Sequence, residues 1–305
     1  MDLSLRCIYP SLKWVRQLVV DTFYSLQDKS MFIFLIGIIG LLVGSFLNVV
    51  IHRLPLMLER AFKAECAAFE CGIEPAPAKP YNLMVPRSAC PHCQHQITAL
   101  ENIPVLSWLA LKGKCSQCKA VISARYPIIE LLTALISAGL AWHFGMGLAL
   151  AGALILAWFL IALIMIDADT YLLPDSMTLP LIWLGLLFNS FNTFTTLQSA
   201  VYGAIAGYLS LWSVYWAFKL FTGKEGMGYG DFKLLAALGA WFGWSMIPMI
   251  ILLSSFAGAT IGIVMVLGQK RGWNKPMPFG PYLGVAGLLA LIWGKDLSLA
   301  LYGIA

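Results

Sequence analysis

Five long intervals of this chain contain no Asp, Glu, Lys or Arg, and they limit what it can fold into. One runs from Ser30 to Ile51 and the last runs from Pro276 to Gly294. At 1.5 Å per residue, each is about long enough to cross the ~30 Å apolar core of a bilayer once. The other three hold 36, 43 and 36 residues, which suits two crossings each: Leu131–Ile166, Ser176–Phe218 and Leu234–Gln269. The intervals therefore predict about eight transmembrane segments.

These segments are predicted to be helices, because their apolar runs are continuous and do not alternate as barrel strands do. Each double-length interval has turn-forming residues near its middle, at 143–147, 189–196 and 242–248. Only 11% of the 305 residues are charged, against about 25% in soluble domains. The expected fold class is an all-α polytopic membrane protein in contact with the lipid bilayer, and we expect no nucleic-acid partner.

The distribution of basic residues predicts the orientation of the helices. Each double crossing returns the chain to the side it left, so four polar segments should face one compartment: 52–130, 167–175, 219–233 and 270–275. They hold 15 of the 20 Lys and Arg residues, and an excess of basic residues marks the cytoplasmic side. We expect four parts: an N-terminal extension at 1–29 that suits an interfacial helix, a first transmembrane helix at 30–52, a cytoplasmic loop at 53–126 and a seven-helix membrane domain at 127–305.

The cytoplasmic loop contains two CxxC pairs, Cys90 with Cys93 and Cys115 with Cys118. Each pair can present two thiolates from one tight turn, and two such turns complete a tetrahedral zinc site. A closed site of this kind predicts structural zinc. Disulfides and thiol redox chemistry are the alternatives, but a cytosolic loop disfavours disulfides and redox chemistry needs only one pair. His92 and His95 lie close enough in sequence to substitute as ligands.

Two carboxylates at the ends of apolar segments need a functional explanation. Asp167 follows the uninterrupted run IALIMI, and Asp231 follows GMGYG, where Gly228 and Gly230 allow close approach of backbone or substrate. A lone Asp at such a boundary is often only a helix cap, and Asp175 fits that interpretation well. Two carboxylates that meet, however, can act as acid and base on one water molecule, which is aspartic-protease chemistry.

Several motifs together make the chain resemble one family, the bacterial type IV prepilin peptidases that serve type IV pili and type II secretion. The motifs are GSFLNVVIHRLP, the two CxxC pairs, ENIP, RYPIIE, IDADTYLLPD, GKEGMGYGDFKLLAALGAW and PFGPYL. The resemblance implies that Asp167 and Asp231 are the catalytic pair, that Gly228, Gly230 and Asp175 support them, and that the four cysteines hold zinc.

The resemblance also implies two activities at the inner membrane. The enzyme would cleave the leader of prepilins and pseudopilins on the cytoplasmic side, and it would then methylate the new N-terminal amine with S-adenosylmethionine. No motif here indicates where that methyl donor binds, since GMGYG follows no predicted strand.

Three alternatives use parts of the same pattern. A proton-coupled transporter would use the acids as a relay, but it needs more polar groups deep in the helices. A scaffold protein with a zinc loop would leave the GxGD sequence without a function. A presenilin-like intramembrane aspartyl protease also uses GxGD, but it does not explain the cysteines or IDADTYLLPD.

Overall fold

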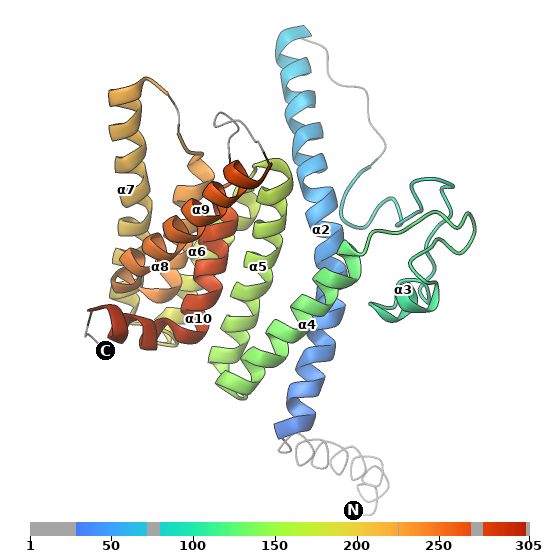
Figure 1. The fold of residues 1–305 in the computed structure, drawn as a ribbon, viewed down its shortest axis with the longest axis horizontal. Helices are drawn as coiled ribbons and strands as arrows, with labels where there is room; N and C mark the ends of the chain where they lie inside the picture. The colour runs from blue at the N-terminus through green and yellow to red at the C-terminus, as the bar shows by residue number, and fades with distance from the viewer. Residues whose placement is uncertain (1–28, 72–79, 225, 270–276, 303–305) are drawn as a thin grey trace, which may run out of the picture.

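The computed structural model describes residues 29–71, 80–224, 226–269 and 277–302, and this part of the chain is mostly helical, apart from the loop before α4 (Figure 1). The predicted interfacial helix at 1–29 lies outside the described residues, except for Lys29. In the described part, only two isolated β-bridges occur, and both lie in the loop before α4. The helices are α2 Lys29–Cys71, α3 Leu106–Ala110, α4 Arg125–Phe144, α5 Leu148–Thr170, α6 Asp175–Ser190, α7 Leu197–Thr222, α8 Tyr229–Phe242, the 3₁₀ helix η1 Trp244–Met246, α9 Ile247–Gln269 and α10 Gly280–Tyr302.

The three double-length intervals each break where turn residues were expected. Gly145 ends α4 with φ 65°, and Gly243 ends α8 with φ 84°, conformations that favour glycine. Between α6 and α7, the Asn189 side chain accepts hydrogen bonds from the backbone N–H groups of Phe194 and Thr195. Each interval therefore forms a helical hairpin.

Among the described residues, four segments are long and apolar enough to cross a membrane by length and composition: α2, α4, α5 and Trp244–Met265, which includes η1 and most of α9. The helices α6 and α8 have 16 and 14 residues, so they are only about 24 and 21 Å long. Residues 280–294 of α10 form another apolar stretch below the length for a full crossing. The chain is a helical membrane protein, and eight crossings remain a prediction.

The first helix is longer than the predicted transmembrane segment. The helix α2 continues for 43 residues through Pro55, at which one backbone hydrogen bond is lost. The predicted boundary between a first span at 30–52 and a loop at 53–126 falls inside this helix. The residues after Pro55 include many good helix formers, such as Leu, Met, Glu, Arg, Lys and Ala, which favour continuation.

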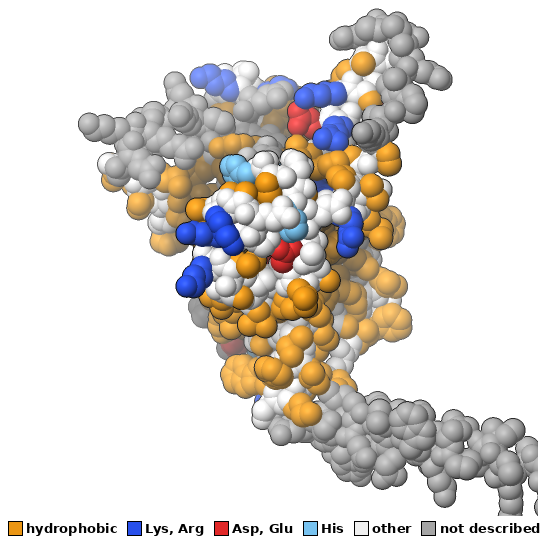
Figure 2. Space-filling view, turned by 90° about the vertical axis from the view of Figure 1, so that its right-hand side faces the viewer, with side chains coloured by type: hydrophobic (Ala, Val, Ile, Leu, Met, Phe, Trp, Pro, Cys, Tyr) orange, Lys and Arg blue, Asp and Glu red, His pale blue; other side chains and the backbone are white. Residues whose placement is uncertain are grey.

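The helices pack through small residues. The helix α4 packs on α2, α8 packs on α6 and α7, and α10 packs on α5, α8 and α9. A Cβ atom at Gly203 on α7 would collide with the backbone of Gly239 on α8, so these two helices touch along their backbones. The core of the whole helical bundle consists mainly of fully buried aliphatic side chains from α5 and α8. Figure 2 looks onto the loop before α4, where basic side chains gather, above a helical surface that is mostly hydrophobic.

Candidate active site and metal centre

Asp167 lies in the last turn of α5. The helix ends at Tyr171, which adopts a left-handed conformation with φ 57° and donates its N–H to the backbone carbonyl of Asp167, with N and O 2.9 Å apart. The chain then turns through Leu173 into α6. The Asp167 side chain is buried, with 5% of the residue exposed. A carboxyl group in the last turn of an apolar helix lacks the favourable dipole that the first turn offers.

Asp231 lies in the first turn of α8, which begins after Gly228. Its backbone N–H donates to the Gly228 carbonyl, with N and O 3.3 Å apart, and its side chain is buried, with 7% of the residue exposed. A Cβ atom at Gly230 would lie 2.7 Å from the Cβ of Leu173, so this position requires glycine. At Gly228 an added Cβ would meet only the Asp231 carboxylate at an ordinary 3.9 Å. A steric clash therefore explains why residue 230 must be glycine, but it does not explain the glycine at position 228.

The structure brings the two predicted aspartates together. Leu173 packs beside Gly280, which lies against the Asp167 carboxyl group, and also against Gly230, the residue before Asp231. One oxygen of each, Asp167 Oδ2 and Asp231 Oδ1, is buried and has no hydrogen-bond partner among the described residues. Buried polar atoms normally have partners, and an orphan needs an explanation such as catalysis or a bound water. Two adjacent buried carboxyl groups hold one shared proton more readily than two charges.

Two ion pairs flank the aspartates on the same side of the helices. Arg125, the first residue of α4, pairs with Asp169, and its Nη1 lies 2.9 Å from Oδ1. Lys233 on α8 pairs with Asp175, and its Nζ lies 2.6 Å from Oδ1. The four side chains are partly exposed. The chain thus has a charged rim next to two buried carboxyl groups.

The four predicted metal ligands form one cluster. The Sγ atoms of Cys90, Cys93, Cys115 and Cys118 all lie within 4.8 Å of one another. Cys90 and Cys118 are 3.7 Å apart, and Cys93 and Cys115 are 3.9 Å apart. Four sulfurs at the usual Zn–S distance of ~2.3 Å form a tetrahedron with edges of about 3.8 Å. The donor set and its spacing therefore fit zinc, and His92 and His95 are not part of the cluster.

The two CxxC turns have the same backbone arrangement. The N–H of Cys90 donates to His95, and the N–H of Cys115 donates to Ala120. The backbone N–H groups of Cys93 and His92 lower the pKa of the Cys90 thiol. Those of Cys118 and Gln117 lower the pKa of the Cys115 thiol to about 6. Since zinc binds the thiolate, these donors favour the metal-binding form.

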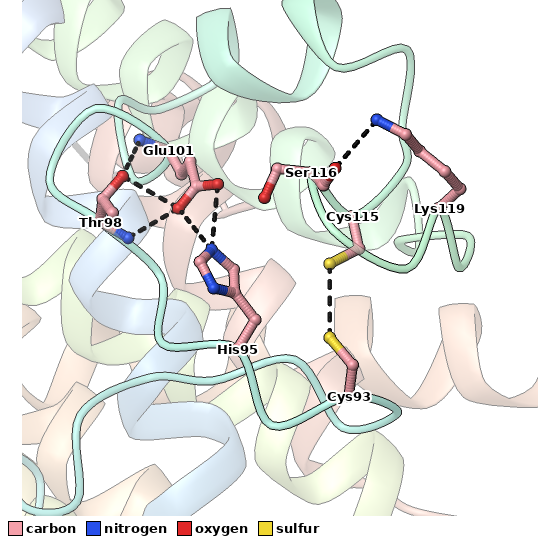
Figure 3. A network of polar contacts seen from close by, with 7 residues as sticks. All are labelled: Cys93, His95, Thr98, Glu101, Cys115, Ser116 and Lys119. Atoms are coloured by element: carbon pink, nitrogen blue, oxygen red, sulfur yellow. Dashed lines mark hydrogen bonds and ion pairs between the residues drawn. The ribbon is translucent and has the colours of Figure 1, made fainter.

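Figure 3 shows Glu101 bonded to Thr98 and His95, with the Ser116 side chain on its other side. Its carboxylate accepts hydrogen bonds from the backbone and hydroxyl of Thr98 at 2.8 and 2.9 Å, and it lies 3.2 Å from Nε2 of His95. The Ser116 hydroxyl, Thr98 and His95 together lower the pKa of Glu101 to about 2. Thr98 and His95 follow the first cysteine pair, and Ser116 lies within the second. Glu101 is therefore hydrogen-bonded to residues that follow the first cysteine pair, and Ser116 of the second pair also stabilises its ionised form.

Two polar contacts attach the loop to the helices, and a third joins α2 to the first turn of α4. The backbone N–H of Val105 donates to Oε2 of Glu130, a buried residue of α4, at 2.8 Å. Asn48 on α2 donates to the Tyr126 carbonyl at 3.1 Å, and Arg53 on α2 donates to the Asn82 carbonyl at 3.0 Å. A buried carboxyl group or guanidinium without such partners would cost several kcal/mol, roughly 1–3 or more. These contacts fix the loop against the membrane domain.

Several residues at both sites had no role assigned from the sequence. Near the aspartates these residues are Gly280, which contacts Asp167, Leu173, which packs against Gly230, and Lys233, which binds Asp175. At the metal centre the residue is Glu101, whose ionised form is stabilised from both cysteine turns. The sequence did contain an indication of Glu101 and Gly280, because they belong to ENIP and PFGPYL, two of the motifs that carry the family resemblance. Neither motif indicates its contact partner, which lies elsewhere in the chain.

Comparisons with known proteins agree with this arrangement. Residues 38–144 match the bacterial peptidase A24 N-terminal domain, and residues 154–263 match the type IV leader peptidase family. The chain is similar to proteins named prepilin leader peptidase/N-methyltransferase. Those of Stutzerimonas stutzeri and Aeromonas hydrophila are each 59% identical to it, over 86% and 87% of this chain and 90% and 91% of theirs. That of Pseudomonas aeruginosa is 57% identical over 86% of this chain and 90% of its own. No solved structure matches the chain.

Proposed function

Because this chain belongs to the type IV leader peptidase family, we propose that it is a membrane aspartic endopeptidase and N-methyltransferase. Its substrates are prepilins and pseudopilins. It removes their leader peptide and then methylates the N-terminal amine that cleavage exposes. The three relatives named above carry both activities in their names, and this chain covers about nine tenths of each of them.

The observation that carries the peptidase proposal is the meeting of Asp167 and Asp231 at the ends of two different helices. Both carboxyl groups are buried, and each has one oxygen without a partner among the described residues. One carboxylate takes a proton from a water molecule, whose oxygen attacks the carbonyl carbon of the scissile peptide bond. The other carboxyl group gives its proton to the amine nitrogen as the C–N bond breaks. One water is consumed, and the pair ends with the same number of protons.

The position of the pair suits a substrate with a basic leader and an apolar helix. The scissile bond of such a substrate lies at the membrane surface, between its charged and apolar parts. The aspartates lie beside the charged rim of Arg125, Asp169, Lys233 and Asp175. We place this rim at the cytoplasmic face of the inner membrane, with the eight helices α2 and α4 to α10 in the bilayer.

The methyltransferase half requires a methyl donor, and the name N-methyltransferase that the relatives carry implies S-adenosylmethionine. That donor would supply a methyl group to the free N-terminal amine of the cleaved pilin. We place its site in the cytoplasmic loop, 53–126. Zinc at Cys90, Cys93, Cys115 and Cys118 has a structural role in this proposal, because four protein ligands leave no open position.

A cleavage assay tests the proposal. The full-length protein in detergent is incubated with a purified prepilin, and mass spectrometry follows loss of the leader and, after addition of S-adenosylmethionine, methylation of the product. We expect both steps from the wild type. A pre-cleaved pilin serves as the control substrate, because it needs methylation only. Intact prepilin after incubation with folded wild-type protein would contradict the peptidase proposal.

A further inference from the structure

The helix α10 packs against both helices that carry the aspartates, through three glycines on one face. Gly280, Gly284 and Gly287 follow the i, i+4, i+7 spacing that places residues on one side of a helix. An added Cβ at Gly284 would collide with Ile164 on α5. At Gly287 it would lie 2.6 Å from Leu238 on α8 and 3.2 Å from Leu160 on α5. The helix α10 therefore lies in the groove between α5 and α8.

Gly280, the first residue of α10, contacts the Asp167 carboxyl group directly. An added Cβ atom there would lie 2.5 Å from Oδ2 and 3.0 Å from Cγ of Asp167. The backbone of Gly280 therefore lies directly against this carboxyl group. This contact is possible only because position 280 has no side chain.

Leu173 packs between this glycine and the glycine of the second motif. Its Cδ1 lies 3.1 Å from the place of a Cβ at Gly280, and its Cβ lies 2.7 Å from that of a Cβ at Gly230. Leu173 is buried, with 7% of the residue exposed. One side chain thus touches the backbone beside Asp167 and the residue immediately before Asp231. The three motifs IDADTYLLPD, GxGD and PFGP meet at this leucine.

We propose that Gly280 and Leu173 are positioning residues of the peptidase, with Gly280 fixing the Asp167 carboxyl group and Leu173 setting its separation from Asp231. This inference rests on the proposed peptidase function. Neither residue carries a group that reacts. Their effect is geometric, and displacement of a catalytic group by about 1 Å can cost about 100-fold in rate.

The test compares two glycine-to-alanine substitutions on the same face of α10. Gly280→Ala adds a methyl group against Asp167, whereas Gly284→Ala, one helical turn later, adds it against the apolar end of Ile164. Both strain the α10–α5 packing, so Gly284→Ala is the matched control. Each protein is assayed with the same purified prepilin over a range of substrate concentrations and pH, and thermal unfolding in detergent reports the fold.

We expect Gly280→Ala to lower kcat about 100-fold, with a small change in KM and an altered pH–rate profile. Gly284→Ala should keep the wild-type profile and most of the wild-type kcat. If wild type and Gly284→Ala cleave prepilin but Gly280→Ala cleaves equally well, the positioning role is wrong and the proposed function stands. If the wild type does not cleave, the proposed function itself fails.

A second pair of variants covers the case in which Gly280→Ala does not fold. Leu173→Ala removes the side chain that packs between Gly280 and Gly230 without adding a clash. Its control is Leu140→Ala, which creates a comparable cavity at a fully buried position of α4. We expect Leu173→Ala to lower kcat at least tenfold more than Leu140→Ala. Equal kcat values for these two variants would overturn the assignment of Leu173.

Discussion

Lys233 on α8 holds Asp175 at the start of α6 by both carboxylate oxygens, with N–O distances of 2.6 and 2.7 Å. Lys233 follows Asp231 by two residues, and Asp175 follows Asp167 by eight. The ion pair therefore joins the two chain segments that carry the aspartates, outside the buried pair itself. Asp175 is more than the helix-start residue that its position after Pro174 predicted.

Breaking this ion pair should reduce cleavage moderately. Both side chains are partly exposed, and exposed pairs contribute up to about 1 kcal/mol, or about fivefold in an equilibrium. We expect Lys233→Met or Asp175→Asn to lower kcat/KM by up to about fivefold in the prepilin assay. The double charge exchange, Lys233→Asp with Asp175→Lys, should recover part of the loss. No recovery would mean that the two residues act separately.

Replacing either buried aspartate with asparagine should abolish cleavage while leaving the fold intact. Asparagine has nearly the same shape, but it cannot accept or return the proton. General acid and base catalysis contributes about 10²- to 10⁴-fold each, so we expect at least this loss in kcat for Asp167→Asn and Asp231→Asn. Methylation of a pre-cleaved pilin by the same proteins is the control. Normal cleavage by either variant would contradict its catalytic role.

Removing one cysteine of the cluster should release the metal. A structural zinc site needs its four ligands, so we expect Cys115→Ser to lower the zinc content of the purified protein from about one ion per chain to a small fraction. Atomic emission measures this directly. Cys66→Ser is the matched control, since Cys66 is a cysteine of α2 outside the cluster. The loop of Cys115→Ser should also be cut more rapidly by added protease. Equal zinc contents in the two variants would rule out the cluster as the site.

Glu101 should stabilise the metal centre at neutral pH and lose that effect in acid. Its pKa falls to about 2 in the folded loop, from an ordinary value of 4.5, because Ser116, Thr98 and His95 bind its ionised form. The folded state therefore favours the carboxylate, and the contribution is complete above pH 4.5 and declines as the pH falls toward 2.

The corresponding measurement compares wild type with Glu101→Gln in thermal unfolding of the zinc-loaded protein. We expect a difference in midpoint that is constant between about pH 7 and 5 and shrinks below about pH 4.5. Loss of metal through thiolate protonation affects both proteins, so the difference between them isolates Glu101. A difference that grows on acidification would contradict the assigned role.

Much of the arrangement followed from the sequence because its signals are local. The uncharged intervals predicted the helical membrane class, and the hairpin turns at Gly145 and Gly243 lie where Gly-containing turns were expected. The CxxC spacing predicted the four-sulfur cluster that the structure contains. The predicted family is confirmed by the comparisons, which do not favour the transporter or the presenilin-like protease.

The remaining features depend on contacts between distant parts of the chain. The sequence shows that Gly280 lies between Pro278 and Pro281 in PFGP, but not that it faces Asp167. It shows Glu101 in ENIP, but not that Ser116 reaches it. Lys233 also appears as one basic residue among several. Helix lengths were a further limit, because α8 ends after 14 residues at Gly243 and α2 passes through Pro55 without a break.

The uninterrupted α2 is a single rod-like helix that is longer than the membrane is thick. Its 43 residues measure about 65 Å from end to end, roughly twice the ~30 Å thickness of the bilayer's hydrocarbon core. If it stands upright, about half of it projects beyond the lipid tails. A force applied to the projecting half would be transmitted along the rod to its junction with α4, near Asn48 and Tyr126.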